Sequence, residues 1–460
     1  DEVAPGQTAD ALRERLTAVG YAVHDVDGHD ADQIKRALGA HLNAHENGGR
    51  PVAVVARTVK GWGTPSLQGE GHHGKAVDPE DLTDVLEELD PQRNGGSPDP
   101  DLSTPPMPSR PPASGPYRRD PLTFHEALEA FAVDEWIDDG TLATRKAYGL
   151  ALRALGHARE DVVALDGDVK NSTHTEQFAD DPALAHRYFE ARIAEQNMVS
   201  AAAGLAAAGK IPFVSSFGKF LTRAYDQIEM ALLGGAALRL VGSHCGISLA
   251  ADGPSQMALP DVAWFRSLST VRVDGDRPLI HVLTPSDAVS AYALTVAMAE
   301  HDGASYLRTL RPALPIAYGA GDTFTLGGHH VRRRGGDVLV AASGYMVHVA
   351  EKAVDVLAED GIEATLVDLY SLPFDEEAIV ELARAGGHRV LTVEDNFGNA
   401  MGSAVADACA RTGEALTVEQ MYVDRLPKSG RSPEDLLRHC GLSVEDIVRR
   451  AKSVLDRENR

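Results

Sequence analysis

The chain has 460 residues, of which 43% are hydrophobic and 24% are charged, and its net charge is −24 at pH 7. At roughly 150 residues per domain, this length predicts about three domains. No apolar run approaches the ~18 residues that span a bilayer, and the excess of negative charge disfavours nucleic acid and anionic membrane surfaces as partners. These features favour a soluble globular protein.

The N-terminus and the cysteines bear on the compartment. The sequence begins at Asp1, and neither a basic nor an apolar signal region follows, so we expect no signal peptide within it. Cys245, Cys409 and Cys440 lie far apart and form no CxxC pair, which favours a reducing cytosol over a disulfide framework or a zinc site. We therefore expect a cytoplasmic protein whose cysteines are small buried hydrophobic residues.

Residues 8–91 alternate amphipathic and apolar stretches, which indicates a βα pattern. The predicted elements are helices over 11–19 and 32–45 and strands over 21–28 and 51–58, the second strand being buried. Asp78-Pro79-Glu80 is predicted to open a further helix that runs to about Leu89, with Asp78 as its N-cap. This region is typical of the last part of a larger α/β domain.

Residues 92–120 are rich in Pro, Gly and Ser and lack periodicity, so we predict a linker there. Strands are predicted over 161–167, 211–217, 237–244, 337–344, 364–370 and 389–396, and helices over 197–209, 286–300, 346–360, 375–386 and 398–412. The predicted fold class is α/β, with three domains and mainly parallel sheets. Its domains cover residues 1–91, 121–320 and 321–460.

The most informative segment is EARIAEQNMVSAAAGLAAAG (190–209), where Glu195 begins a helix directly after an apolar stretch. We expect its carboxylate to be partly buried. On this observation alone, Glu195 is equally a first-turn charge that complements the helix dipole.

This segment, LATRKAYGLALRALGHAREDVVALDGDVKNST (142–173) and LVGSHCGISLAADGPSQMALPDVAWFRSL (240–268) together resemble the pyrimidine-binding domain of the transketolase family, most closely its animal type. TVKGWGTPSLQGEGHHGK (58–75) resembles the end of the family's diphosphate-binding domain, and residues 321–460 resemble its C-terminal domain. The resemblance implies a homodimer that uses thiamin diphosphate (ThDP) and Mg²⁺. It also implies transfer of a two-carbon ketol unit from a ketose phosphate to an aldose phosphate through a carbanion on the cofactor.

The resemblance assigns cofactor contacts in the pyrimidine-binding region. Glu195 matches the catalytic glutamate that bonds the aminopyrimidine ring, and a carboxyl group in an apolar slot suits a proton shared with a ring nitrogen. Phe217 and Phe220 match the aromatic side chains against that ring, although such a pair is also common in a hydrophobic core. Arg223 and Gln227 extend the same element, and we expect them to be structural.

Substrate contacts follow from the same resemblance. Arg145, Ser172 and Arg311 match positions around the substrate phosphate, where arginine gives bidentate contacts. The remaining matches are His244, Asp252 and Gln256, which meet the substrate hydroxyls, with His244 also catalytic. In a Gly-rich loop, His and Asp are otherwise common turn residues.

In the first region, Lys60 and His73 match positions near the cofactor diphosphate and the reacting carbon. His72 is the alternative to His73, and an exposed His pair is otherwise typical of a solvated loop. Two departures from the family are a long connection over 271–281 and Ala251 at a position that is commonly acidic.

The family binds Mg²⁺ and the diphosphate through Gly-Asp-Gly followed by Asn, because a hard cation prefers carboxylate and amide oxygens. The similar stretches 165–171 and 273–278 have the wrong order and spacing, so we expect the metal ligands outside this chain. Either a longer chain or a separate N-terminal subunit would supply them, and we favour the first because the break falls inside a domain. The alternative functions are a 1-deoxyxylulose-5-phosphate synthase, a dihydroxyacetone synthase or a non-catalytic regulatory subunit.

Overall fold

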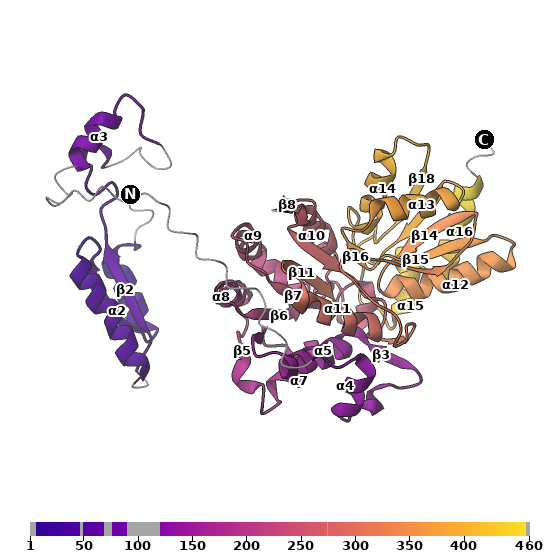
Figure 1. Ribbon diagram of the computed structural model, residues 1–460, viewed down its shortest axis with the longest axis horizontal. Coiled ribbons are helices and arrows are strands. Elements are labelled where there is room, and N and C mark those ends of the chain that lie inside the picture. The colour runs from indigo at the N-terminus through magenta and orange to yellow at the C-terminus, as the bar shows by residue number, and fades with distance from the viewer. Residues whose placement is uncertain (1–5, 47–48, 69–75, 90–119, 274, 457–460) are drawn as a thin grey trace. The chain divides into compact units, whose positions relative to one another are not determined.

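The computed structural model describes residues 6–46, 49–68, 76–89, 120–273 and 275–456. The chain divides into two compact units, residues 1–106 and residues 107–460, and each unit is described by itself. Figure 1 shows the elements of both units along the chain.

The first unit is built on two parallel strands whose register pairs Ala22 with Val52. Its elements are α1 (Ala9–Ala18), β1 (Ala22–Asp27), α2 (Ala31–Glu46), β2 (Val52–Arg57), η1 (Pro65–Leu67) and α3 (Leu82–Leu89). Only Val55 of β2 is buried, so the expected buried strand is wrong, because a sheet of two strands leaves much of each strand uncovered. The predicted helix start is also wrong: the Asp81 N–H donates to the Asp78 carbonyl in a separate turn, and the helix begins at Leu82.

The second unit contains a seven-stranded sheet in the order β16-β10-β11-β7-β6-β4-β5. All neighbouring strands are parallel except the β16 and β10 pair. The strands are β4 (Val162–Asp166), β5 (Tyr188–Glu190), β6 (Ile211–Phe217), β7 (Arg239–Ser243), β10 (Ile280–Leu283), β11 (Ala304–Arg308) and β16 (Ser371–Leu372).

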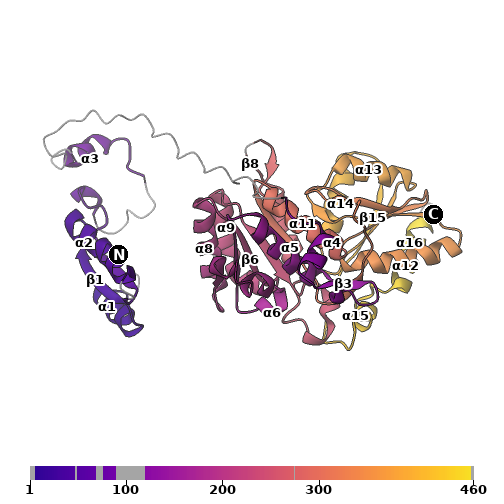
Figure 2. The same ribbon diagram turned by 60° about the horizontal axis from the view of Figure 1, so that its bottom comes forward.

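Successive side chains along a strand point to opposite faces of this sheet, so alternate residues pack against two different layers of helices. In β4, Val163 and Leu165 pack in one cluster with α8 (Glu195–Ala207), α9 (Tyr225–Leu233) and α10 (Asp261–Ser269). Val162 and Ala164 pack in another with α4 (Phe124–Ala130), α5 (Thr144–Ala158) and α11 (Ala288–Glu300). Figure 2 shows the sheet between these two layers.

A second sheet of five strands has the order β13-β15-β14-β17-β18, in which β13 is antiparallel to β15 and the other pairs are parallel. Its strands are β13 (His330–Arg333), β14 (Val338–Ala342), β15 (Ala364–Asp368), β17 (Arg389–Val393) and β18 (Thr417–Met421). The helices that pack on it are α12 (Tyr345–Glu359), α13 (Glu376–Ala385), α14 (Met401–Arg411), α15 (Pro433–Cys440) and α16 (Val444–Leu455). The predicted α/β class with mainly parallel sheets is confirmed.

The two sheets of the second unit share one hydrophobic cluster, in which Leu339 and Val390 of the five-stranded sheet join Leu165 and Val214 of the seven-stranded sheet. Strand β16, from the C-terminal half of the chain, extends the seven-stranded sheet by pairing with β10. The remaining strands form two small pairs: β3 (Thr141–Ala143) with β12 (Ala313–Pro315), and β8 (Arg272–Val273) with β9 (Arg277–Pro278). The second pair accounts for the long connection over 271–281.

Candidate active site

Most of the residues that the sequence assigned to cofactor and substrate in the second unit come from segments at the carboxyl ends of its parallel strands, whereas Arg145 follows β3. Phe217 ends β6, His244 follows β7, and Arg311 follows β11. Parallel strands bring their carboxyl ends to one edge of a sheet, which is where α/β proteins bind ligands. The candidate site of this unit therefore lies at that edge of the seven-stranded sheet.

Glu195 is the first residue of α8, and only 2% of its side chain is exposed. No side chain caps this helix, because the N-cap position is Ala194. The carboxylate instead accepts a hydrogen bond from Arg223, whose Nη1 lies 2.6 Å from Oε1 of Glu195. A buried carboxylate needs such a partner, since an unpaired buried charge is costly. Arg223 therefore contacts the carboxylate that the sequence assigned to catalysis, and its expected structural role stays a prediction.

Aromatic rings form a column beside this carboxylate. The rings of Phe217 and Phe220 are stacked with centroids 4.8 Å apart and an interplanar angle of 5°. The His244 ring is stacked on Phe217 at 3.9 Å and 11°. The guanidinium carbon of Arg223 lies over the Phe220 ring, 5.2 Å from its centroid. Phe217 is thus engaged by two protein rings, and its direct contact with a cofactor ring stays a prediction.

Two arginines define a cationic part of the site. Arg145, at the start of α5, donates from Nη1 to the main-chain carbonyl of Ser172 at 2.8 Å. Arg311 donates from Nη1 to Oδ1 of Asp252, also at 2.8 Å. Burial and then the charge of Arg311 lower the pKa of Arg145. The two guanidinium groups therefore repel one another, which favours an anion near them.

His244 is buried and has a left-handed backbone, with φ of 59°. Its Nδ1 lies 2.9 Å from the Ser243 hydroxyl oxygen, which fixes the ring. Burial, followed by the charges of Arg145 and Arg311, lowers the pKa of His244 to about 3. The imidazole is therefore neutral at physiological pH, and one nitrogen accepts while the other donates.

Gln256 lies four residues after Asp252, and its Oε1 accepts a hydrogen bond of 2.5 Å from the Ser255 hydroxyl. No hydrogen bond joins Gln256 to the arginines within the described part of the second unit. Its predicted role toward substrate hydroxyls thus rests on the sequence alone. Gln227 donates to Asp226 at 3.3 Å on α9.

Lys60 lies in the first unit, exposed in a turn after β2 in which the Trp62 N–H donates to the Val59 carbonyl. The turn is fixed by His29, whose Nε2 accepts from the Val59 N–H at 2.8 Å and whose ring stacks on Trp62 at 4.5 Å. His73, together with its alternative His72, lies outside the described residues.

Two buried groups at the same edge of the sheet, Asp166 and His174, had no role predicted from the sequence. Asp166 ends β4 and accepts hydrogen bonds from the hydroxyls of Thr173 and Thr175, each at 2.7 Å. Burial raises the pKa of Asp166 to about 6. The ring of His174 has no hydrogen-bond partner, and burial lowers the pKa of His174 to about 4. An acidic residue at the end of a buried strand was the available signal for Asp166.

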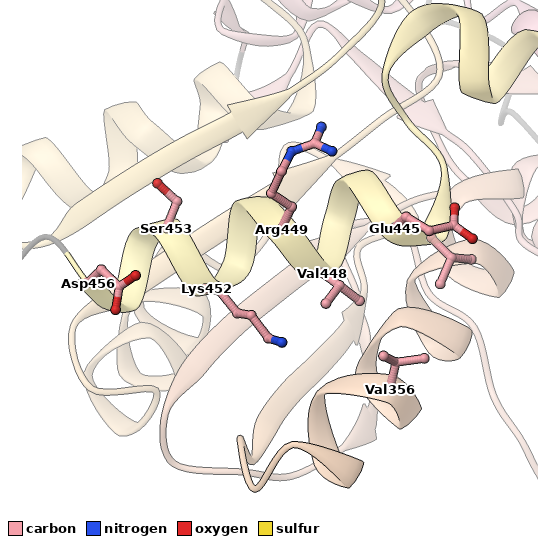
Figure 3. Close-up of a pocket in the computed structure, with 8 residues that line it drawn as sticks. Val356, Glu445, Val448, Arg449, Lys452, Ser453 and Asp456 are labelled. Carbon is pink, nitrogen blue, oxygen red and sulfur yellow. The ribbon is translucent and has the colours of Figure 1, made fainter.

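A groove of about 810 Å³ lies elsewhere in the second unit, between α12 and α16 (Figure 3). Val356 and Val448 supply apolar surface, while Arg449 and Lys452 extend from α16. Both cations are already paired, Arg449 with Asp446 and Lys452 with Asp360. The groove contains none of the residues assigned to cofactor or substrate.

Three further features concern the cysteines, groups of metal-ligating side chains and membrane-spanning helices. Cys245, Cys409 and Cys440 are buried and free, as predicted. Among the residues that the structure describes, no group of three or more His, Cys, Asp or Glu side chains is placed to hold a metal ion. No helix within the described ranges is long and apolar enough to cross a membrane.

Comparison with known protein families matches three models in order along the chain. They are the transketolase thiamine diphosphate binding domain over residues 2–94, the transketolase pyrimidine binding domain over 140–316 and the transketolase C-terminal domain over 327–447. A transketolase-like protein 2 from Mus musculus is 36% identical over 468 residues, which cover 98% of this chain and 70% of the mouse protein. The transketolase of Homo sapiens is 36% identical over 453 residues, or 97% of this chain and 68% of the human protein.

Solved structures give the same match. A chain described as a split gene transketolase, inactive beta4 tetramer, is 34% identical with a TM-score of 0.60, and the match covers 69% of this chain and 99% of that one. The transketolase of Campylobacter jejuni has the same fold, with a TM-score of 0.67 over 96% of this chain and 69% of that one at 18% identity. The chain therefore belongs to the transketolase family.

Proposed function

We propose that this chain carries out a transketolase reaction, the transfer of a two-carbon ketol unit from a ketose phosphate to an aldose phosphate with ThDP. The observation that carries the proposal is the buried carboxylate of Glu195 beside the stacked rings of Phe217 and Phe220. A planar heterocycle with a protonatable ring nitrogen fits such a site, because it can stack on an aromatic ring and share a proton with the carboxylate. The residues present thus fit the aminopyrimidine part of ThDP.

When bound, ThDP supplies a thiazolium carbon that takes up and releases the two-carbon unit. The work of the chain is to orient the cofactor and to move protons. Glu195, whose side chain is buried, would bond the pyrimidine nitrogen and hold a proton there. Phe220 supports the plane of the ring, and Phe217 supports both Phe220 and His244.

Arg145 and Arg311 bind the substrate phosphate in this proposal. Their mutual repulsion in the free chain is relieved by a dianion, and Arg311 exchanges Asp252 for phosphate oxygens. Ser172, which already lies beside Arg145, completes the phosphate contacts. The neutral imidazole of His244 exchanges hydrogen bonds with the substrate hydroxyls, together with Asp252 and Gln256.

The remaining parts of the proposal concern the rest of the cofactor and the assembly. Lys60 and His73 would hold the cofactor near its diphosphate and its reacting carbon, and Mg²⁺ would take its ligands from residues outside this chain. The enzyme works in the cytoplasm as a homodimer, with a separate N-terminal subunit as the alternative to a longer chain. Its domains cover residues 1–91, 121–320 and 321–460, and residues 92–120 link the first two.

The test is an assay of the native assembly, purified without removing any companion protein. The assembly is incubated with Mg²⁺, ThDP, a panel of ketose phosphates and ribose 5-phosphate, and the products are identified by mass spectrometry. We expect a ketose phosphate longer by two carbons than the acceptor, formed only when ThDP is present. In parallel incubations, an assembly that binds ThDP but makes a deoxy sugar phosphate from pyruvate and glyceraldehyde 3-phosphate, or transfers the two-carbon unit only to added formaldehyde, would support a related synthase. Absence of any ThDP binding would support a non-catalytic subunit.

A further inference from the structure

The two side chains that form the contact between Glu195 and Arg223 differ in their exposure to solvent. The carboxylate side chain is 2% exposed, whereas 53% of the Arg223 side chain is exposed. Since the hydrogen bond from Arg223 is the side-chain contact that the structure gives to Glu195, a half-exposed surface group is the partner of a buried carboxylate. An ion pair with one exposed partner is weak and easily exchanged, because water can replace that partner.

The position of Arg223 follows from a short 3₁₀ segment, η5 (Phe220–Ala224), in which residues three apart lie one above the other. The guanidinium of Arg223 consequently lies over the Phe220 ring, 5.2 Å from the centroid, while its Nη1 donates to Glu195. A guanidinium is flat, carries N–H donors at its rim and stacks on aromatic faces. Arg223 thus contacts the carboxylate and the ring at the same time.

These two contacts are the ones that a cofactor ring needs in the proposed site: an N–H···O bond to the carboxylate and a flat contact with Phe220. We propose that Arg223 is an internal placeholder, which occupies the aminopyrimidine position in the free chain and swings into solvent when the cofactor ring binds. The inference rests on the proposed function in one respect, the identity of the ring as the aminopyrimidine of ThDP. Arg223 is then a positioning residue that keeps Glu195 paired until the ring arrives.

The first measurement uses the full chain without cofactor. Carboxyl groups are labelled with a water-soluble carbodiimide and glycine ethyl ester, and tandem mass spectrometry separates the label on Glu195 from that on Glu190. Arg223→Met removes the planar charge at similar length, and we expect Glu195 to be labelled about fivefold faster, the factor expected for loss of a half-exposed ion pair. Arg223→Lys keeps the charge without the planar stack and should give an intermediate rate.

The matched control is Arg192→Met. Arg192 lies three residues before Glu195, has a side chain that is 79% exposed, and contacts Asp168 rather than Glu195. This variant changes the net charge by the same amount as Arg223→Met. Because Arg192 does not contact Glu195, Glu195 should be labelled at the same rate as in the unmodified chain. Urea unfolding of every variant checks that each is folded under the labelling conditions.

The second measurement repeats the labelling with thiamin, which carries the aminopyrimidine ring without the diphosphate. If Arg223 occupies the ring position, thiamin protects Glu195 in Arg223→Met at about a fifth of the concentration needed in the unmodified chain. Equal protection in both proteins, protection of neither, or an equal labelling rate without thiamin would overturn the inference. Failure of the proposed function is read separately, as absence of ThDP-dependent ketol transfer by the native assembly.

Discussion

Two buried carboxylates in the second unit, Glu195 and Glu394, sit close to the start of a helix but are held in different ways. Glu394 follows β17 and accepts hydrogen bonds from the Met401 and Gly402 N–H groups at the start of α14, and from the amide of Asn396. Glu195 accepts its bond from the half-exposed Arg223. Fixed backbone donors saturate the first carboxylate, whereas the second has a partner that can be exchanged.

In our proposal, this difference separates a structural carboxylate, Glu394, from a functional one, Glu195. A carboxylate whose oxygens are filled by the N–H groups of its own fold stabilises that fold and has little capacity left for a ligand. A buried carboxylate with a removable partner is available to a ring nitrogen. Burial and position alone do not distinguish the two, because both side chains are at most 2% exposed.

The largest expected effect is on stability at the saturated carboxylate. Glu394→Ala leaves the Met401 and Gly402 N–H groups buried without an acceptor, and we expect a loss of about 4 kcal/mol in the free energy of unfolding. Glu195→Ala frees only the exposed Arg223 and should cost about 1 kcal/mol. Urea unfolding of both variants measures the two values. Equal losses of unfolding free energy in the two variants would show that the two carboxylates are not held differently.

The second effect is a pH dependence at Asp166, which lies at the same edge of the sheet as Glu195. Burial raises the pKa of Asp166 from 3.8 to about 6 in the folded chain. Its stabilising contribution is therefore fully present below pH 3.8 and is lost as pH rises through 6, a change of about 3 kcal/mol. Asp166→Asn keeps hydrogen-bonding groups for Thr173 and Thr175 and removes the titration.

Unfolding of the unmodified chain and of Asp166→Asn is compared between pH 4 and pH 7.5. The stability of the variant relative to the unmodified chain should rise with pH over this range. A difference that is constant with pH would show that Asp166 does not titrate there.

The strands that the sequence predicted lie within a few residues of strands in the structure, because each is a continuous apolar run bounded by polar residues, whereas β10 and β11 of the seven-stranded sheet were not predicted. The strand over 211–217 agrees with β6 at both ends. Short elements such as β16 were missed, since two residues carry no periodicity and their pairing with β10 is long-range. The start of α3 was misplaced because an Asp-Pro signal also fits the turn that precedes the helix.

The site was predicted to the extent that single residues match a family pattern, as Glu195, Arg145 and His244 do. Their partners could not be predicted, because they depend on side-chain directions across loops. The contact from Arg223 to Glu195 spans 28 residues and needs a 3₁₀ turn, where an α-helical turn would have placed the guanidinium differently. The stacking of His244 on Phe217 likewise joins the ends of two strands.

A third, smaller effect concerns the phosphate site. Arg311→Met removes one of the two repelling guanidinium groups but leaves Arg145 in place. We expect KM for the sugar phosphate to rise about tenfold, equivalent to about 1.4 kcal/mol, with kcat changed much less. The matched control is Arg332→Met in the five-stranded sheet, whose side chain pairs with Glu351 and should leave KM unchanged. Equal KM values for both variants would remove Arg311 from the substrate site.

The smallest effect concerns helix capping. The start of α8 has no side-chain cap, whereas Asp375 caps α13 by accepting from the Ala378 N–H at 3.1 Å. Asp375→Ala should lower the free energy of unfolding by about 1 kcal/mol without changing ketol transfer. Urea unfolding measures the change in stability, and the transfer assay measures activity. A change in transfer would contradict a purely structural role for Asp375.

We propose that the exchangeable carboxylate of Glu195, and not the saturated carboxylate of Glu394, is the catalytic group. The most direct measurement compares Glu195→Gln with Glu394→Gln in ThDP-dependent ketol transfer by the native assembly, with the folded fraction of each sample measured by circular dichroism. We expect Glu195→Gln to lose about a thousandfold in transfer rate while remaining folded, and Glu394→Gln to retain transfer in proportion to its folded fraction. Full transfer activity in folded Glu195→Gln would contradict this proposal.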